Sequence, residues 1–112
     1  MIESYNFGAM AVDGQKYTAD LIIFPGKIKS DWWRREGHKL TLEDLEGVFQ
    51  EDIEVLVVGT GFYGLMRVEE DVKQAAQARG LTLHIEKTKK ATQIFNEFSS
   101  RKKTAGAFHL TC

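Results

Sequence analysis

The sequence contains only one cysteine, one proline and almost no net charge, and each shortage excludes a class of protein. A single thiol, Cys112, cannot form a disulfide within the chain, which fits a reducing compartment. The net charge of −1 provides no general field that would attract nucleic acid. No apolar run approaches the roughly 20 residues that cross a bilayer, so no membrane partner is expected. The N-terminus resembles neither a secretory signal nor a transit peptide. The sequence therefore predicts a cytoplasmic protein.

Residues that carry chemistry are also scarce. The three histidines, His38, His84 and His109, show no ligand spacing with Cys112, so we predict no metal site and no cofactor. In an extended strand, His109 and Cys112 point to opposite faces and do not form a nucleophile with its base. We assign no catalytic residue, and the roles of His109 and Cys112 stay open.

The most informative stretch is the run Val55-Leu56-Val57-Val58, which is apolar and mostly β-branched. Such a run is typical of a strand that is buried on both faces inside a sheet. We also expect a hairpin at Asp13-Gly14, strands at residues 19–24, 27–33, 81–86 and 104–111, and a short helix from Thr41. Two longer helices are predicted, one over residues 69–79 and one capped by Thr88.

Residues 1–112 fit one compact domain. The predicted fold class is α/β: a central mixed, largely parallel sheet flanked by helices, with an N-terminal antiparallel β-hairpin region. The strand at residues 81–86 follows a helical crossover and should run parallel to the apolar strand.

The glycines after the apolar strand give the sharpest functional hypothesis. Residues 59–64 read G-T-G-F-Y-G, formally G-x-G-x-x-G, but residues 65–68 separate them from the next predicted helix. A dinucleotide-binding helix would begin within the glycine motif, so the structural interpretation of these glycines is favoured. A crevice at the carboxyl ends of parallel strands is still the expected place for a small ligand. The candidate lining residues are Gly59, Thr60, Gly61 and Thr88.

The adjacent pair Trp32-Trp33 gives a second hypothesis. In an extended segment the two rings point to opposite sides, so one fills the core and the other covers a surface, with Arg34 or Arg35 available to stack. We therefore take Trp33 and Arg34 as candidate partner-binding residues. The acidic stretch of residues 36–54 and the basic clusters at residues 87–90 and 101–103 are most simply solvated surfaces, although the acidic one could meet a basic partner.

Four motifs together resemble one family: DWWRREGH at residues 31–38, VLVVGTGFYG at 55–64, TKKATQIFN at 88–96 and GAFHLTC at 106–112. In this order they look like the small uncharacterised domain family that includes the adipogenesis-associated domain protein and the mitochondrial complex I assembly factor three. The resemblance covers essentially the whole chain and implies a single α/β domain with no established enzyme activity. It matches the following residues to family motifs: Gly59, Gly61, Thr88, Ala91, Phe95, Asn96, His109, Thr111 and Cys112.

The sequence thus predicts a non-catalytic binding or assembly module with an unidentified protein partner or small molecule, and leaves its oligomeric state open. The alternative is a small-molecule or nucleotide-binding protein, or a small enzyme, that uses the cleft at Gly59, Thr60 and Gly61. Nucleic acid is not an expected partner.

Overall fold

The structure is a computed structural model that describes residues 1–112. Its helices and strands follow the chain in this order: β1 (Ile2–Asn6), β2 (Ala9–Val12), β3 (Gln15–Tyr17), β4 (Leu21–Phe24), β5 (Lys27–Lys29), β6 (Lys39–Leu40), η1 (Leu42–Leu45), η2 (Val48–Gln50), β7 (Val55–Thr60), β8 (Arg67–Val68), α1 (Glu70–Ala78), β9 (Thr82–Glu86), α2 (Thr88–Ser99) and β10 (Thr104–His109). No helix is both long enough and apolar enough to cross a membrane.

The main sheet has five strands in the order β5-β4-β10-β7-β9. β7 runs parallel to β10 on one side and to β9 on the other, while β4 is antiparallel to both β10 and β5. All six residues of β7 are buried, as the apolar run predicted. The predicted α/β class with a mixed, largely parallel sheet is confirmed, and the central position belongs to β10, the last strand.

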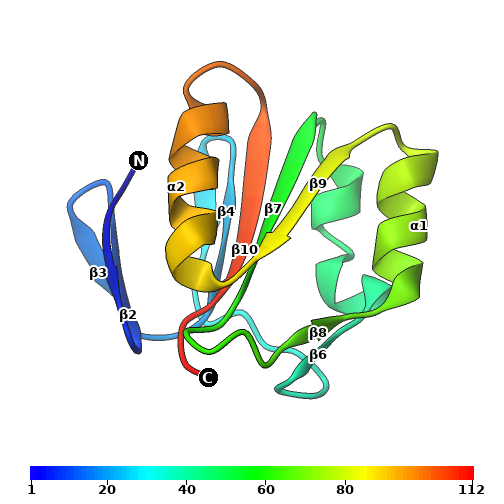
Figure 1. Cartoon of the computed structure of the whole chain (residues 1–112). Helices are drawn as coiled ribbons and strands as arrows, with labels where there is room; N and C mark the ends of the chain where they lie inside the picture. The colour runs from blue at the N-terminus through cyan, green and yellow to red at the C-terminus, as the bar shows by residue number, and fades with distance from the viewer.

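The two faces of the main sheet are covered by different elements (Figure 1). One hydrophobic cluster joins Leu56 and Val58 of β7 to α1 and the two short helices. The other joins Val55 and Val57 to α2 and to the small sheet β1-β2-β3. Alternate residues of β7 thus enter opposite cores, as the period of two in a strand requires.

The N-terminal antiparallel region is confirmed and has one strand more than the hairpin predicted at Asp13-Gly14. Asp13 and Gly14, with φ of 49° and 81°, form the turn between β2 and β3, and β1 pairs with the other edge of β2. Positive φ at both central residues is the geometry that two-residue hairpins favour.

Several predicted boundaries are wrong. The strand expected over residues 27–33 ends at Lys29, because Asp31 adopts a positive φ of 54° and the amide of Trp32 donates to the Asp20 carbonyl. The helix expected from Thr41 is instead two short 3₁₀ helices, η1 and η2, separated by Glu46 and Gly47. The parallel pair β6 and β8, each of two residues, was not predicted because such short strands leave no pattern in the sequence.

Thr88 does not cap α2 as predicted. The helix begins at Thr88 itself, and Lys87 occupies the cap position without a side-chain hydrogen bond. The Thr88 hydroxyl donates instead to the carbonyl of His109 at 2.6 Å and accepts from the amide of Gly61 at 2.8 Å. Its side chain therefore links the ends of β7 and β10 to the start of α2.

Candidate functional site

The carboxyl ends of β7 and β10 meet the C-terminal segment and the turn between β1 and β2 (Figure 1). The amide of Gly8 donates to the carbonyl of Leu110 at 2.8 Å, and the amide of Phe62 donates to the carbonyl of Thr111 at 2.7 Å. Three separate parts of the chain are thus tied together at this end of the sheet, which makes it the first place to search for a site.

A buried ionic cluster lies beneath this end. Asp20 Oδ2 accepts from Arg34 Nη1 at 2.7 Å and lies 2.7 Å from His109 Nδ1, while Asp20 Oδ1 accepts from the amide of Leu110 at 2.7 Å. His109 Nδ1 also lies 3.1 Å from Arg34 Nη2, which can only donate, whereas a carboxylate can only accept. The contact with Asp20 is the shorter of the two and favours the tautomer with its proton on Nδ1. Arg34 and His109 are 8% and 6% exposed, which closes the cluster to solvent on most sides.

The protonation of Asp20 follows from these contacts. Burial alone raises the pKa of its carboxyl, but the hydrogen bonds from His109, the Leu110 amide and Arg34 together lower the pKa below its ordinary value. Asp20 is therefore held as a carboxylate among three donors. Arg34 Nε and His109 Nε2 are buried without a hydrogen-bond partner. Because His109 Nε2 is buried, only a molecule that enters the interior could contact this nitrogen.

Tyr5 extends this polar network towards the surface. Its hydroxyl donates to the carbonyl of Leu110 at 2.8 Å, and burial, followed by the negative charge of Asp20, raises its pKa to about 12. Tyr5 therefore stays protonated over the physiological range, and its ring reaches Phe62 with centroids 6.4 Å apart.

Exposed aromatic rings lie above the network. We define the aromatic patch as Tyr5, Phe7, Phe62 and Tyr63. Within it, the ring centroids are 5.8 Å apart for Phe7 and Phe62, 6.2 Å for Phe7 and Tyr63, and 5.1 Å for Phe62 and Tyr63. Phe7, Phe62 and Tyr63 are 51%, 42% and 59% exposed. Large apolar side chains that touch one another on a surface are a common mark of an interaction site.

The structure brings together some of the residues predicted for a ligand cleft. Gly61 and Thr88 are joined by two hydrogen bonds, since the amide of Thr88 also donates to the carbonyl of Gly61 at 3.1 Å. A Cβ added at Gly61 would lie 2.8 Å from each of the backbone oxygens of Thr111 and Cys112, and φ there is +105°. The five principal surface hollows are lined by other residues, and Gly59, Thr60, Gly61 and Thr88 are all buried. The cleft stays a prediction.

The two predicted partner-binding residues, Trp33 and Arg34, lie in different environments. Trp32 is buried and Trp33 is 85% exposed, so the expectation that one ring fills the core and the other lies at the surface is confirmed. Arg34 lies inside the buried ionic cluster, with its guanidinium 4.9 Å from the centroid of the Trp32 ring. No pattern in the sequence points to its partner Asp20, which lies 14 residues earlier.

No hydrogen bond joins the side chains of His109 and Cys112, and Cys112 contacts a different histidine. Its Sγ is 3.8 Å from His38 Nε2, and the His38 and His109 rings are 6.0 Å apart between centroids. No group of three or more His, Cys, Asp or Glu residues is placed to hold a metal ion.

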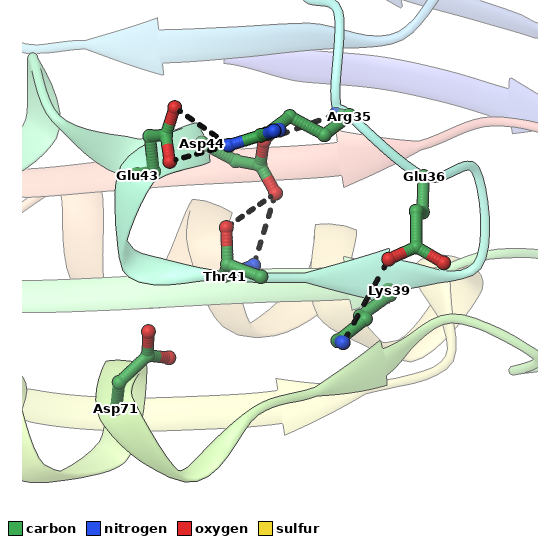
Figure 2. A pocket seen from close by; sticks show the side chains of 7 residues that line it. All are labelled: Arg35, Glu36, Lys39, Thr41, Glu43, Asp44 and Asp71. Carbon is green, nitrogen blue, oxygen red and sulfur yellow. Dashed lines mark hydrogen bonds and ion pairs between the residues drawn. The ribbon is translucent and has the colours of Figure 1, made fainter.

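Two hollows on the surface are lined by residues outside the aromatic patch. We define the polar hollow as the cavity of about 500 Å³ lined by Arg35, Glu36, Lys39, Thr41, Glu43, Asp44 and Asp71. Figure 2 shows its charged groups turned towards one another: Arg35 pairs with Glu43 at 3.0 Å, and Lys39 with Glu36 at 3.7 Å. A more apolar hollow of about 560 Å³ lies between the short helices and α1, lined in part by Leu42, Phe49, Ala75 and Ala78.

Comparisons with known proteins agree with the fold and with the resemblance read from the motifs. A conserved hypothetical protein from Pyrococcus horikoshii OT3 is 31% identical, with a TM-score of 0.84 over 100% of this chain and 99% of that one. A protein of Xanthomonas campestris, 18% identical, has the same fold, with a TM-score of 0.80 over 98% of this chain and 83% of that one.

Among curated proteins, NADH dehydrogenase (ubiquinone) 1 alpha subcomplex assembly factor 3 of Homo sapiens is 28% identical over 109 residues. The match covers 95% of this chain and 58% of that protein, so the chain spans little more than half the length of this relative. Residues 2–109 match the family described as "Protein of unknown function (DUF498/DUF598)". The chain therefore belongs to the DUF498/DUF598 family, whose function is unknown.

Proposed function

We propose that this protein is a non-catalytic binding or assembly module that holds a protein partner on its aromatic patch. The observation that carries the proposal is the exposure of Phe7, Phe62 and Tyr63 as one connected group of rings. Aromatic side chains supply large contact areas and are enriched at the centres of protein interfaces.

The setting of the patch supports a binding role. Phe62 and Tyr63 follow the glycine turn, whose Gly61 is hydrogen-bonded to Thr88, and Phe7 lies in the turn fixed by the contact of Gly8 with Leu110. Rings on a fixed backbone lose less conformational freedom on binding than rings on a loose loop. The patch is therefore organised before a partner arrives.

A relative and the cysteine content also support this proposal. The human relative is named as an assembly factor, and a protein-binding role for this chain is in keeping with that name. We place the protein in the cytoplasm, because its single cysteine fits a reducing compartment.

The experiment that tests this function starts from affinity capture with the purified chain in an extract of its own cells. Captured proteins are identified by mass spectrometry, and each candidate is then purified and titrated against the chain. We expect Tyr63→Ala to raise the dissociation constant of the true partner by about tenfold or more. Truncating a hot spot of an interface produces an effect of this size.

The comparison variant is Trp33→Ala, which removes the exposed ring of the partner-binding surface predicted from the sequence. This variant should bind the partner as the wild type does. Equal binding by wild type, Tyr63→Ala and Phe62→Ala would contradict the proposal, provided that circular dichroism shows all three to be folded.

The alternative is a small-molecule or nucleotide-binding protein, or a small enzyme, that uses Gly59, Thr60, Gly61 and Thr88. It is supported by the contact of Gly61 with Thr88 at the carboxyl end of β7. Its test is a thermal-shift screen with nucleotides and metabolites, since a ligand at 100 times its dissociation constant raises the stability by about 2.7 kcal/mol. A hit whose binding is lost in a Gly61→Asp variant that circular dichroism shows to be folded would favour the alternative.

A further inference from the structure

Three unpaired lysines lie at the start of α2, the helix that adjoins the aromatic patch. Lys87, Lys89 and Lys90 are exposed, and none of them lies within 4.0 Å of a carboxylate oxygen. The first turn of α2 contains no acidic residue. The amino end of a helix carries partial positive charge, so cations there repel the helix dipole and acids are preferred.

Two of these lysines flank the aromatic patch. A Cβ added at Gly64, next to Tyr63, would lie 3.0 Å from Lys87 Cγ, so the stem of Lys87 crosses the backbone beside the patch. Lys89 lines a small hollow together with Tyr5, whose ring belongs to the patch. Lys87 and Lys89 therefore place positive charge beside the patch. Glu3 lines the same hollow as Lys89, but neither lysine forms an ion pair.

We propose that the segment docking on the aromatic patch is acidic as well as apolar, so that its aromatic or aliphatic side chains cover Phe7, Phe62 and Tyr63 while its carboxylates face Lys87 and Lys89. This inference rests on the proposed function and names the chemistry of the partner. Opposite charges across an interface increase the association rate and discriminate against partners of the wrong charge. A basic segment would add its own charge to lysines that already repel the helix dipole.

The test is selection from a phage library of random peptides of about 12 residues, panned on the intact purified chain. We expect the selected peptides to combine aspartate or glutamate with aromatic or large aliphatic residues. The synthesised peptides should bind at least tenfold more weakly to Lys87→Glu/Lys89→Glu and to Tyr63→Ala. The control Lys73→Glu changes a lysine on α1 that is also exposed and unpaired, and it should leave binding unchanged.

Several outcomes would contradict an acidic partner segment. Selected peptides that are basic or uncharged, or peptides whose binding falls equally in Lys73→Glu, would overturn the acidic partner. The same holds if no peptide is selected, or if the chain sediments with phosphatidylserine vesicles in a manner that depends on Lys87 and Lys89, because the surface would then serve a membrane. A native partner lost in Tyr63→Ala but retained in Lys87→Glu/Lys89→Glu would also overturn it while leaving the proposed function intact. A partner retained by both variants would refute the two together.

Discussion

The polar hollow is lined by six charged residues and the aromatic patch is flanked by two lysines, and the two regions use their charges in opposite ways. In the polar hollow, Arg35 and Lys39 are paired with Glu43 and Glu36 (Figure 2). Beside the aromatic patch, Lys87 and Lys89 have no such partners, while the paired charges lie in the interior at Asp20. Charges satisfied within the molecule offer little to a partner, so the hollow with the larger number of polar groups is the weaker functional candidate.

The comparison also separates buried from exposed ion pairs. The Arg34 and Asp20 side chains are 5% and 16% exposed, whereas those of Arg35 and Glu43 are 71% and 64% exposed. Exposed pairs contribute roughly 0 to 1 kcal/mol, but removing one partner of a buried pair leaves the other charge without solvent or counter-ion.

The largest effect is expected for Asp20→Asn, which removes the central charge of the buried cluster. Arg34 would remain buried without its carboxylate, and we expect a loss of about 3 kcal/mol in the free energy of unfolding. Urea denaturation followed by circular dichroism measures it. The matched change in the polar hollow, Glu43→Gln, should cost less than about 1 kcal/mol, and equal losses would remove the distinction between the two regions.

The second effect concerns two threonine hydroxyls. Thr88→Val keeps the shape of the side chain but leaves the amide of Gly61 and the carbonyl of His109 without their partner, so we expect a loss of about 2 kcal/mol. Thr41→Val removes the hydroxyl that donates to Asp44 in the partly buried polar hollow. Thermal and urea unfolding should show a clearly smaller loss for Thr41→Val, because water can replace its contact.

A third prediction concerns acid. The folded pKa of Asp20 lies below its unfolded value, so its contribution to stability is complete above the ordinary carboxyl pKa of 3.8 and is lost as the pH falls from there through the lowered value. The stability difference between wild type and Asp20→Asn should therefore shrink in that acid range. Unfolding curves from pH 6 downwards test this, and a difference that grew with acid would show that Asp20 is not held as a carboxylate.

The smallest effect is expected for Tyr63→Ala. The ring is 59% exposed, so its loss should change the free energy of unfolding by less than about 0.5 kcal/mol. Partner binding should nevertheless fall by about tenfold. A large loss of stability would mean that the aromatic patch belongs to the core rather than to an interface.

Much of the fold could be predicted because each main element leaves a local pattern. Val55 to Val58 could only suit an interior strand, and Gly80, with φ of 71°, ends the helix where the sequence indicated. Boundaries failed where tertiary contacts override local preference. Thr88 has the chemistry of a helix cap, but its hydroxyl is taken by Gly61 and His109, which are distant in sequence.

The site was harder to predict than the fold. The glycine turn was located correctly, yet the aromatic patch joins Phe7 to Phe62 and Tyr63 across more than 50 residues, and no spacing rule connects them. The buried cluster likewise joins Asp20, Arg34 and His109 from three distant segments. A polar residue whose partners are distant in the sequence leaves no local pattern, and this is why the sequence does not point to Asp20.

The central place of β10 has a consequence for how the protein is made. β4 and β7 have no direct pairing with each other and meet only through β10, which is the last strand of the domain to be synthesised. On the ribosome, the edges of β4 and β7 that pair with β10 stay unpaired until residues 104–109 have left the exit tunnel. The native sheet therefore closes after translation of the domain rather than during it, and a nascent chain stalled before β10 should be a substrate for chaperones.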